Sequence, residues 1–164
     1  LLKSLALNYQ YNQNNWELGA GLGYGERAPS VSEGYGFYLF NSFERYDYIG
    51  NPNLEKEESL EANTFIVFKK EIFTAKISSS YFHISNYIIG KKILGLIPMT
   101  IGANGVKMYS SIDYATIFNV DFITEIQILE NLKWNAQLGY NRGKDNHNES
   151  LPFMSPFSNK DSNS

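Results

Sequence analysis

Residues 16–25 read WELGAGLGYG, and this stretch alternates strictly between two kinds of side chain. The even positions carry Trp, Leu, Ala, Leu and Tyr, whereas the odd positions carry Glu followed by four glycines. Successive side chains of a β-strand point to opposite faces of a sheet, so this period of two predicts a strand with one apolar face. The glycine spacing does not fit a phosphate-binding loop that opens a helix.

The same alternation continues on both sides of this stretch. It covers the segments 5–12, 60–69, 73–81, 112–128 and 132–141. The connections between these segments are short at 12–15, 69–71 and 130–131, and long at 26–53, 86–107 and 143–155. Alternating short and long connections are typical of outer-membrane barrels, which have tight periplasmic turns and long extracellular loops. We therefore predict an all-β fold, an antiparallel meander of about six transmembrane strands that forms a partial β-barrel.

The composition excludes several classes of protein. The chain has 12 Tyr, 11 Phe and 2 Trp among its 164 residues, which is too aromatic for an intrinsically disordered chain. Its net charge of -3 argues against a nucleic-acid partner, because phosphate contacts need a basic surface. It has no cysteine, so a disulfide framework, a thiolate metal site and a cysteine nucleophile are all excluded.

The placement of the rings indicates what covers the apolar face. Trp16 and Trp134 each open a strand after a tight turn, while Tyr24, Tyr81 and Tyr140 lie near the opposite strand ends. Rings at both ends of apolar strands are typical of the aromatic girdles of membrane barrels, so we expect lipid on this face. A soluble β-sandwich, in which a second sheet covers the apolar face, is the alternative.

Several short motifs resemble those of TonB-dependent receptors, the plugged outer-membrane transporters of Gram-negative bacteria. They are the ERAP, EGY, GNPNL and EES motifs at 26–29, 33–35, 50–54 and 57–59, the strand at 109–121, and the LPFMSP loop at 151–156. Asn119, Asp121 and Ser155 depart from the family pattern. The resemblance runs from about Trp16 to Phe157 and rests on the order and spacing of the motifs.

The resemblance implies a function, partners and a location. The chain would be part of the barrel wall of a receptor for energy-coupled uptake of a siderophore, a cobalamin-like molecule or a glycan. Its partners would be outer-membrane lipid, the plug domain of the same full-length chain, the inner-membrane TonB complex and the extracellular ligand. The location would be the bacterial outer membrane, and neither an enzyme activity nor a cofactor is expected. A passive porin or structural barrel is the alternative.

We also expect the chain to be an internal to C-terminal piece of such a barrel. No plug domain, TonB box or final aromatic-terminated strand is recognisable. The piece alone is expected to be inactive, because an open sheet of about six strands leaves two unpaired edges and a lipid-seeking face. Residues 1–157 would form the partial barrel, and the polar residues 158–164 would form a disordered tail.

The long connection 26–53 is the candidate ligand site. Its rings could stack on sugars or flat chelate rings, and its arginines could donate bidentate hydrogen bonds to carboxylates. The predicted ligand-binding residues are Arg27, Tyr35, Tyr38, Phe43, Arg45 and Tyr46. The alternative is that these rings only extend the barrel or steady the loop. No catalytic residue and no metal site is predicted, and the polar segment 145–149 is interpreted as a solvated loop.

Overall fold

The computed structural model describes residues 1–151 in full and the backbone of residues 157–163. Its elements are β1 (Ser4–Gln13), β2 (Trp16–Arg27), α1 (Val31–Tyr35), β3 (Leu39–Asn41), β4 (Tyr46–Ile49), β5 (Glu57–Lys70), β6 (Phe73–Ile93), β7 (Val106–Leu129), β8 (Leu132–Asp145) and β9 (Phe157–Asn163). The predicted all-β class is therefore confirmed. Among the described residues, no helix has the length and apolar character needed to cross a membrane.

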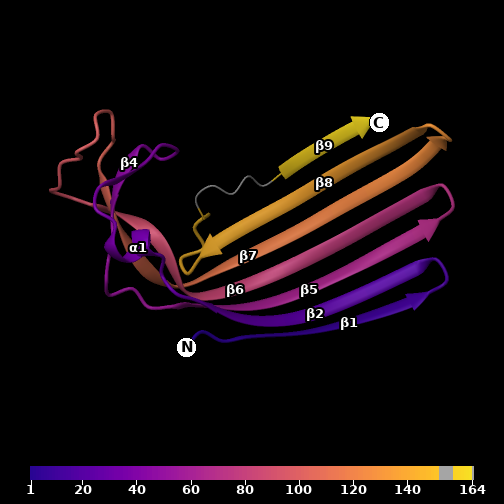
Figure 1. Ribbon diagram of the computed structural model, residues 1–164, viewed down its shortest axis with the longest axis horizontal. Coiled ribbons are helices and arrows are strands. Elements are labelled where there is room, and N and C mark those ends of the chain that lie inside the picture. The colour runs from indigo at the N-terminus through magenta and orange to yellow at the C-terminus, as the bar shows by residue number, and fades with distance from the viewer. Residues whose placement is uncertain (152–156, 164) are drawn as a thin grey trace. The chain divides into compact units, whose positions relative to one another are not determined.

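The long strands form a meander within one sheet. Their order is β1-β2-β5-β6-β7, after which β8 pairs with β7 and β9 pairs with β8 (Figure 1). The short strands β4 and β3 extend the sheet from another part of β7, where β4 runs parallel to it. Within the described residues β1 and β9 lie at opposite ends of the long-strand order, so the sheet is open, as expected of a partial barrel.

The predicted tight turns are all present. β1 closes onto β2 around Asn14 and Asn15, and β7 closes onto β8 around Glu130 and Asn131. The third turn joins β5 to β6. Asn14 has a φ of 50°, a left-handed conformation that asparagine tolerates better than most residues. Figure 1 shows that the three turns lie at the same end of the long strands.

Two of the predicted long connections contain more regular structure than expected. β6 continues to Ile93 and β7 begins at Val106, so the connection predicted at 86–107 is shorter than expected. The connection at 26–53 contains α1, β3 and β4. The strands arise because cross-strand pairing continues after the two-faced sequence pattern has faded, whereas α1 is a separate helical turn with its own capping box.

The chain divides into two compact units. The loop unit consists of Leu1–Leu2, Glu26–Glu58 and Ile84–Tyr114. The wall unit consists of Lys3–Gly25, Ser59–His83 and the chain from Ala115 onward.

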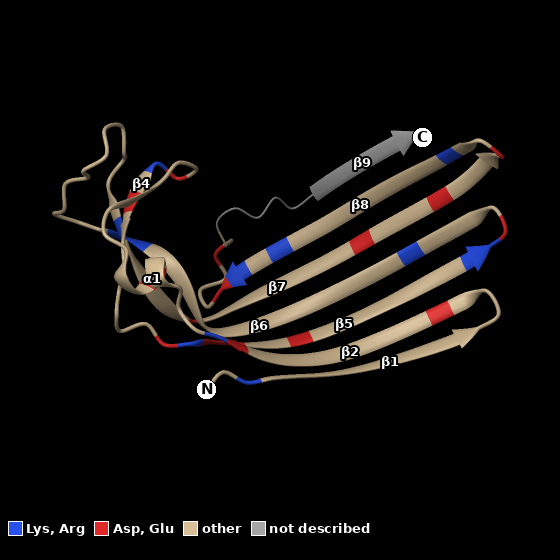
Figure 2. Cartoon of the chain, in the orientation of Figure 1, with Lys and Arg blue, Asp and Glu red and all other residues tan. Residues whose placement is uncertain are grey.

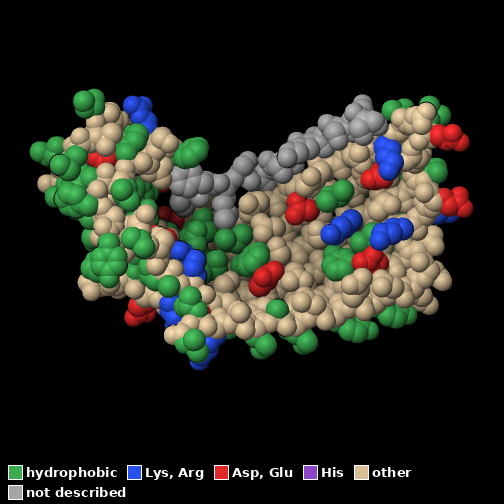
Figure 3. All heavy atoms as spheres, in the orientation of Figure 1, with side chains coloured by type: hydrophobic (Ala, Val, Ile, Leu, Met, Phe, Trp, Pro, Cys, Tyr) green, Lys and Arg blue, Asp and Glu red, His purple; other side chains and the backbone are tan. Residues whose placement is uncertain are grey.

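The wall unit exposes its apolar side chains. Leu22 is 63% exposed, whereas its neighbour Gly21 on the opposite face is buried. Other exposed apolar side chains are Leu5, Leu7, Leu18, Leu60, Ile66, Ile77 and Leu138. The view in Figure 3 shows acidic and basic side chains spread over one face of the wall strands, and Figure 2 shows these charges spaced singly along them. A sheet with an uncovered apolar face and a charged opposite face is the pattern of a barrel wall between lipid and lumen.

Gly19 and Gly21 of β2 are covered by side chains of neighbouring strands. A Cβ on Gly19 would overlap the ring of Phe65, and one on Gly21 would overlap the side-chain oxygen of Asn8. Nζ of Lys76 lies over the ring of Phe65, 5.5 Å from its centroid. These glycines therefore relieve crowding within the wall.

Rings gather beside the short turns of the wall unit. The ring centroids of Trp16 and Phe68 are 4.8 Å apart, and those of Phe68 and Phe73 are 6.3 Å apart. Trp16 opens β2 and Phe73 opens β6, directly after two of the turns. This cluster is the arrangement expected of an aromatic girdle at a membrane interface.

The polar C-terminal segment forms a strand where a disordered tail was expected. Residues Phe157–Asn163 pair with β8, with Phe157 opposite Tyr140 and Asn163 opposite Trp134. A sheet ladder is held by main-chain hydrogen bonds, so a polar sequence can add to an existing edge. Residue 164, the end of the expected tail, lies outside the described residues.

Candidate functional site in the loop unit

All six predicted ligand-binding residues belong to the loop unit. The structure divides them into three settings. Arg27 lies in an ion-pair network, Tyr35, Tyr38 and Phe43 belong to the ring-bearing segments around α1 and β3, and Arg45 and Tyr46 lie at the start of β4.

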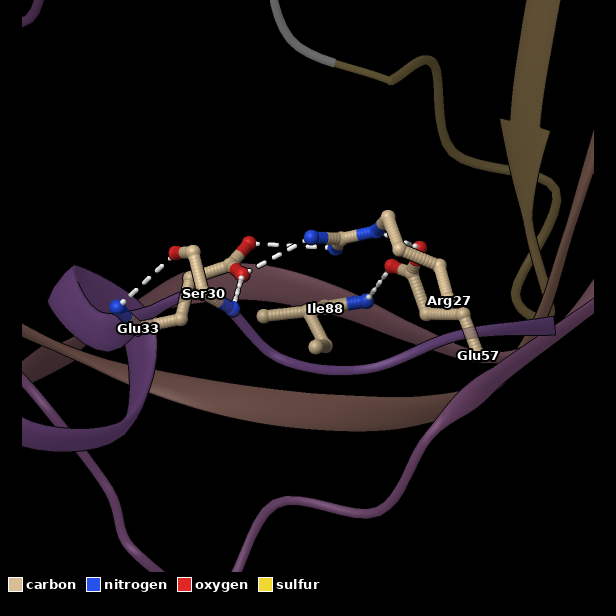
Figure 4. A network of polar contacts seen from close by, with 5 residues as sticks. All are labelled: Arg27, Ser30, Glu33, Glu57 and Ile88. Carbon is tan, nitrogen blue, oxygen red and sulfur yellow. Dashed lines mark hydrogen bonds and ion pairs between the residues drawn. The ribbon is translucent and has the colours of Figure 1, made fainter. Parts of the chain in front are cut away.

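Arg27, at the end of β2, uses its guanidinium on two carboxylates. Nη1 and Nη2 donate to the two oxygens of Glu33 at 2.8 and 3.1 Å, and Nε donates to Oε2 of Glu57 at 2.7 Å. The other oxygen of Glu57 accepts the N–H of Ile88 at 2.8 Å. Figure 4 shows this network, which joins β2, α1, β5 and β6. A forked arginine between two carboxylates is a strong and directional arrangement.

The helix α1 begins with a capping box. The N–H of Glu33 donates to Oγ of Ser30 at 3.2 Å, and the N–H of Ser30 donates to Oε2 of Glu33 at 2.7 Å. This reciprocal pair satisfies donors that the first turn of a helix leaves free. A helix of five residues is too short to be stable alone, so its caps and contacts hold it in place.

The turn after β4 packs against this helix. The N–H of Gly50 donates to the carbonyl of Gly36 at 2.6 Å, and the N–H of Asn51 donates to the carbonyl of Glu33 at 2.8 Å. The side-chain amide of Asn51 also donates to the carbonyl of Tyr109 in β7 at 3.2 Å. The helix is therefore fixed at both ends.

The charge on Glu33 predicts how the helix responds to pH. Hydrogen bonding to Arg27 lowers the pKa of Glu33 to about 2, from its usual 4.5. A carboxyl whose pKa is lowered by folding stabilises the fold above its unfolded pKa, and this stabilisation disappears as the pH falls through the folded value. We expect pepsin to cleave around α1 progressively faster from pH 4.5 down to pH 2. The excess cleavage of Glu33→Gln over the wild type should shrink across the same range, and a constant excess would contradict the prediction.

Rings project from the segments around α1 and β3. Tyr35 is 77% exposed and Phe43 is 88% exposed. Phe37 and Tyr38 form an edge-to-face pair with centroids 4.9 Å apart, and Tyr38 has a φ of 52°. An aromatic pair in this geometry restricts both rings. Among the described residues of these segments, Tyr35, Phe40 and Phe43 thus offer exposed rings, and Phe37 and Tyr38 form a pair.

Two lysines that were not among the predicted ligand-binding residues lie near the ring of Tyr46. Nζ of Lys107 is 4.8 Å from the ring centroid of Tyr46, and Nζ of Lys92 is 5.7 Å from it. Lys107 also forms an ion pair with Glu44 at 2.8 Å. Ammonium groups within about 6 Å of a ring face are attracted to it, so this cluster is held by cation–π contacts. The parallel pairing of β4 with β7 brings Lys107 to this ring, and that pairing is not visible in the sequence.

The neighbouring Tyr48 is a buried structural residue. Its hydroxyl donates to Oε2 of Glu44, and its ring centroid lies 4.9 Å from that of Tyr109. Burial, together with the hydrogen bond to Glu44, raises the pKa of Tyr48 well above its usual range. Tyr48 therefore has a structural role in β4.

Buried Asp47 holds the apolar connection between β6 and β7. Its Oδ2 accepts the N–H groups of Met99 and Thr100 at 2.7 and 2.9 Å. Burial raises the pKa of Asp47, but these hydrogen bonds outweigh burial and leave the pKa below its ordinary value. Nη2 of Arg45 donates to the carbonyl of Gly102 in the same connection at 3.3 Å. These hydrogen bonds thus fix the connection that contains the exposed residues Leu94, Ile97 and Ile101.

The acidic segment after β8 is closed by its own aspartate. Oδ1 of Asp145 accepts the N–H groups of His147 and Glu149, both at 2.8 Å. These bonds shape a turn of the kind that aspartate commonly forms with the backbone that follows it.

The family comparison matches nearly the whole chain. The profile of the family described as TonB dependent receptor-like, beta-barrel matches residues 1–160. The chain belongs to this family. No curated protein sequence matches it.

Solved structures show the fold of this TonB-dependent receptor barrel. The copper transporter OprC is 18% identical with a TM-score of 0.78, over 98% of this chain and 23% of that one. The siderophore receptor PirA from Pseudomonas aeruginosa is 20% identical with a TM-score of 0.67, over 87% and 28% of the two chains. A ferric enterobactin receptor mutant (PfeA) from the same organism, in complex with enterobactin, is 16% identical with a TM-score of 0.72, over 98% and 25%. The chain spans about a quarter of these TonB-dependent structures, and identities this low show the fold alone.

Proposed function

We propose that this chain forms part of the barrel wall and ligand-facing loops of an outer-membrane receptor that takes up its ligand by energy-coupled transport. The family match over residues 1–160 carries the proposal. The uncovered apolar face of the wall unit supports an outer-membrane location. The plug domain, the inner-membrane TonB complex and an extracellular siderophore, cobalamin-like molecule or glycan would be the other participants.

The loop unit would supply ligand contacts through its exposed rings and its cations. Tyr35, Tyr38 and Phe43 offer rings, and Arg45 with Tyr46 offers a cation beside a ring that two lysines flank. Rings and guanidinium groups are the side chains that most often dominate binding free energy. Helix α1, held by Arg27 and its capping box, and the connection between β6 and β7, held by Asp47, would keep these groups in place before the ligand binds. Such preorganisation lowers the entropic cost of binding.

Binding to the receptor that contains this barrel segment tests the loop assignment. The probes are ferric enterobactin, Cu²⁺, cyanocobalamin and a maltooligosaccharide, each measured by equilibrium dialysis in detergent. For the probe that binds, Phe43→Ala and Arg45→Ala are each expected to weaken affinity by about tenfold or more. Tyr9→Ala is the matched control, because Tyr9 is an exposed ring of the wall unit at 69% exposure. Unchanged affinity in both loop variants would contradict the assignment.

Uptake into cells tests the energy coupling separately. Accumulation of the bound probe is expected to stop when a protonophore collapses the gradient across the inner membrane. A passive channel would continue to admit the probe, and this outcome would favour a porin.

A further inference from the structure

Arg27 joins segments of the loop unit that are distant in the sequence. We propose that Arg27 is a positioning residue, which fixes α1 and its exposed Tyr35 against strands β5 and β6. The inference rests on the proposed function, because it assigns a role within the same ligand-facing loop. It adds a positioning role to the ligand contact that the sequence predicts for Arg27.

Arg27 uses three of its five guanidinium N–H groups within the protein. Three of its N–H groups point to Glu33 and Glu57, whose side chains are only 16% and 10% exposed. Removing the guanidinium from either partner would leave a largely covered carboxylate without its cation. Unpairing a covered charge is unfavourable, so these contacts hold Glu33 and Glu57 together through Arg27.

The network and the helix cap share one atom. Oε2 of Glu33 accepts both Nη1 of Arg27 and the N–H of Ser30. Any movement of the guanidinium therefore acts directly on the first turn of α1. Tyr35 is the last residue of this five-residue helix, so its ring follows the position of the helix. Glu57 completes the link, because its second oxygen holds the N–H of Ile88 in β6.

The same strands carry a second cation between two carboxylates. Nζ of Lys56 pairs with Glu26 at 2.5 Å and with Glu58 at 3.0 Å. Glu26 and Arg27 are adjacent in β2, so their side chains point to opposite faces of the strand. Lys56 links the same region of the chain through partners that exclude Glu33 and Ser30 of the cap. Lys56→Gln is therefore a matched control for the loss of one cation near β2 and β5.

The experiment compares Arg27→Gln, Arg27→Lys and Lys56→Gln in the receptor that contains this segment, without any ligand. Hydrogen exchange is followed over residues 30–38, and trypsin cleavage is followed at the bond after Arg45. Arg27→Gln is expected to raise both rates by about tenfold or more, because it removes three charge-assisted hydrogen bonds. Arg27→Lys keeps the charge without the fork and is expected to give an intermediate rate.

The expected control results separate positioning from general stability. Lys56→Gln should change exchange over residues 30–38 by less than about twofold, and the temperature of barrel unfolding on gels should be the same in all variants. Exchange at the wild-type rate in Arg27→Gln would overturn the proposal. Equal loosening by Lys56→Gln, or a parallel fall in unfolding temperature, would also overturn it. Failure of the proposed function is a different result, in which the wild-type receptor binds none of the four probes.

Discussion

An arginine at Leu138 in β8 is expected to destabilise the folded wall in lipid by about 2–4 kcal/mol more than an arginine at Gln137, if the site lies near the bilayer midplane. Leu138 is 53% exposed on the apolar face and pairs with Phe122 of β7. Gln137 is its neighbour on the charged face and pairs with Ile123. A cation on the apolar face must leave water for hydrocarbon, whereas one on the charged face stays hydrated.

The comparison is made by urea titration of the receptor in lipid vesicles, followed by the gel shift between folded and unfolded barrel. Leu138→Met controls for the change of shape, and we expect it to cost less than about 1.5 kcal/mol. Equal destabilisation by arginine at positions 137 and 138 would contradict the assignment of the lipid-facing side.

Alanine at Gly50 is expected to displace α1 from the turn that follows β4, at a cost of about 1–3 kcal/mol. A Cβ at Gly50 would lie 2.5 Å from the nitrogen of Gly36 and 2.6 Å from the nitrogen of Tyr35. These are backbone atoms, which cannot rotate away as a side chain can. The hydrogen bonds from Gly50 and Asn51 to this helical segment should weaken together. Hydrogen exchange over residues 30–38 measures the displacement.

Gly34 provides the matched control within the helix itself. A Cβ there has no neighbouring heavy atom within 4 Å. Alanine also favours helix over glycine by about 0.5–1 kcal/mol, so Gly34→Ala is expected to leave the helix unchanged or slightly more stable. If hydrogen exchange over residues 30–38 is equally fast in Gly50→Ala and Gly34→Ala, the packing of the turn against α1 does not hold the helix.

The wall could be predicted from the sequence because its determinants are local. In residues 16–25 each face repeats every second position, and each short turn lies between two such segments. The strands of an outer-membrane barrel alternate between apolar outward and polar inward side chains, which is the pattern of this segment. The same local signal was absent from the C-terminal segment, where pairing with β8 determines the structure.

The structure of the loop unit was less predictable for two reasons. Its contacts join residues that are distant in the sequence, and its elements α1, β3 and β4 are very short. The capping box at Ser30 and Glu33 was readable, but a five-residue helix has no apolar stripe to reveal it. The rings were found from composition, whereas Lys92 and Lys107 reach Tyr46 only through tertiary structure. Whether the predicted rings contact a ligand stays a prediction. Nothing in the sequence showed that Arg27 would meet both Glu33 and Glu57.

The two-residue turn at Asn14 and Asn15 also limits how this protein can vary. Gln13 pairs directly with Trp16 across it, so one inserted residue would shift the register of β1 against β2. A shift by one residue turns every side chain of a strand to the opposite face. Leu5, Leu7 and Tyr9 would then turn inward and Asn8 and Gln10 would meet lipid. A change of length at this turn would therefore have to be compensated, for example by a bulge of the kind that interrupts the register of β7 between Gln127 and Leu129.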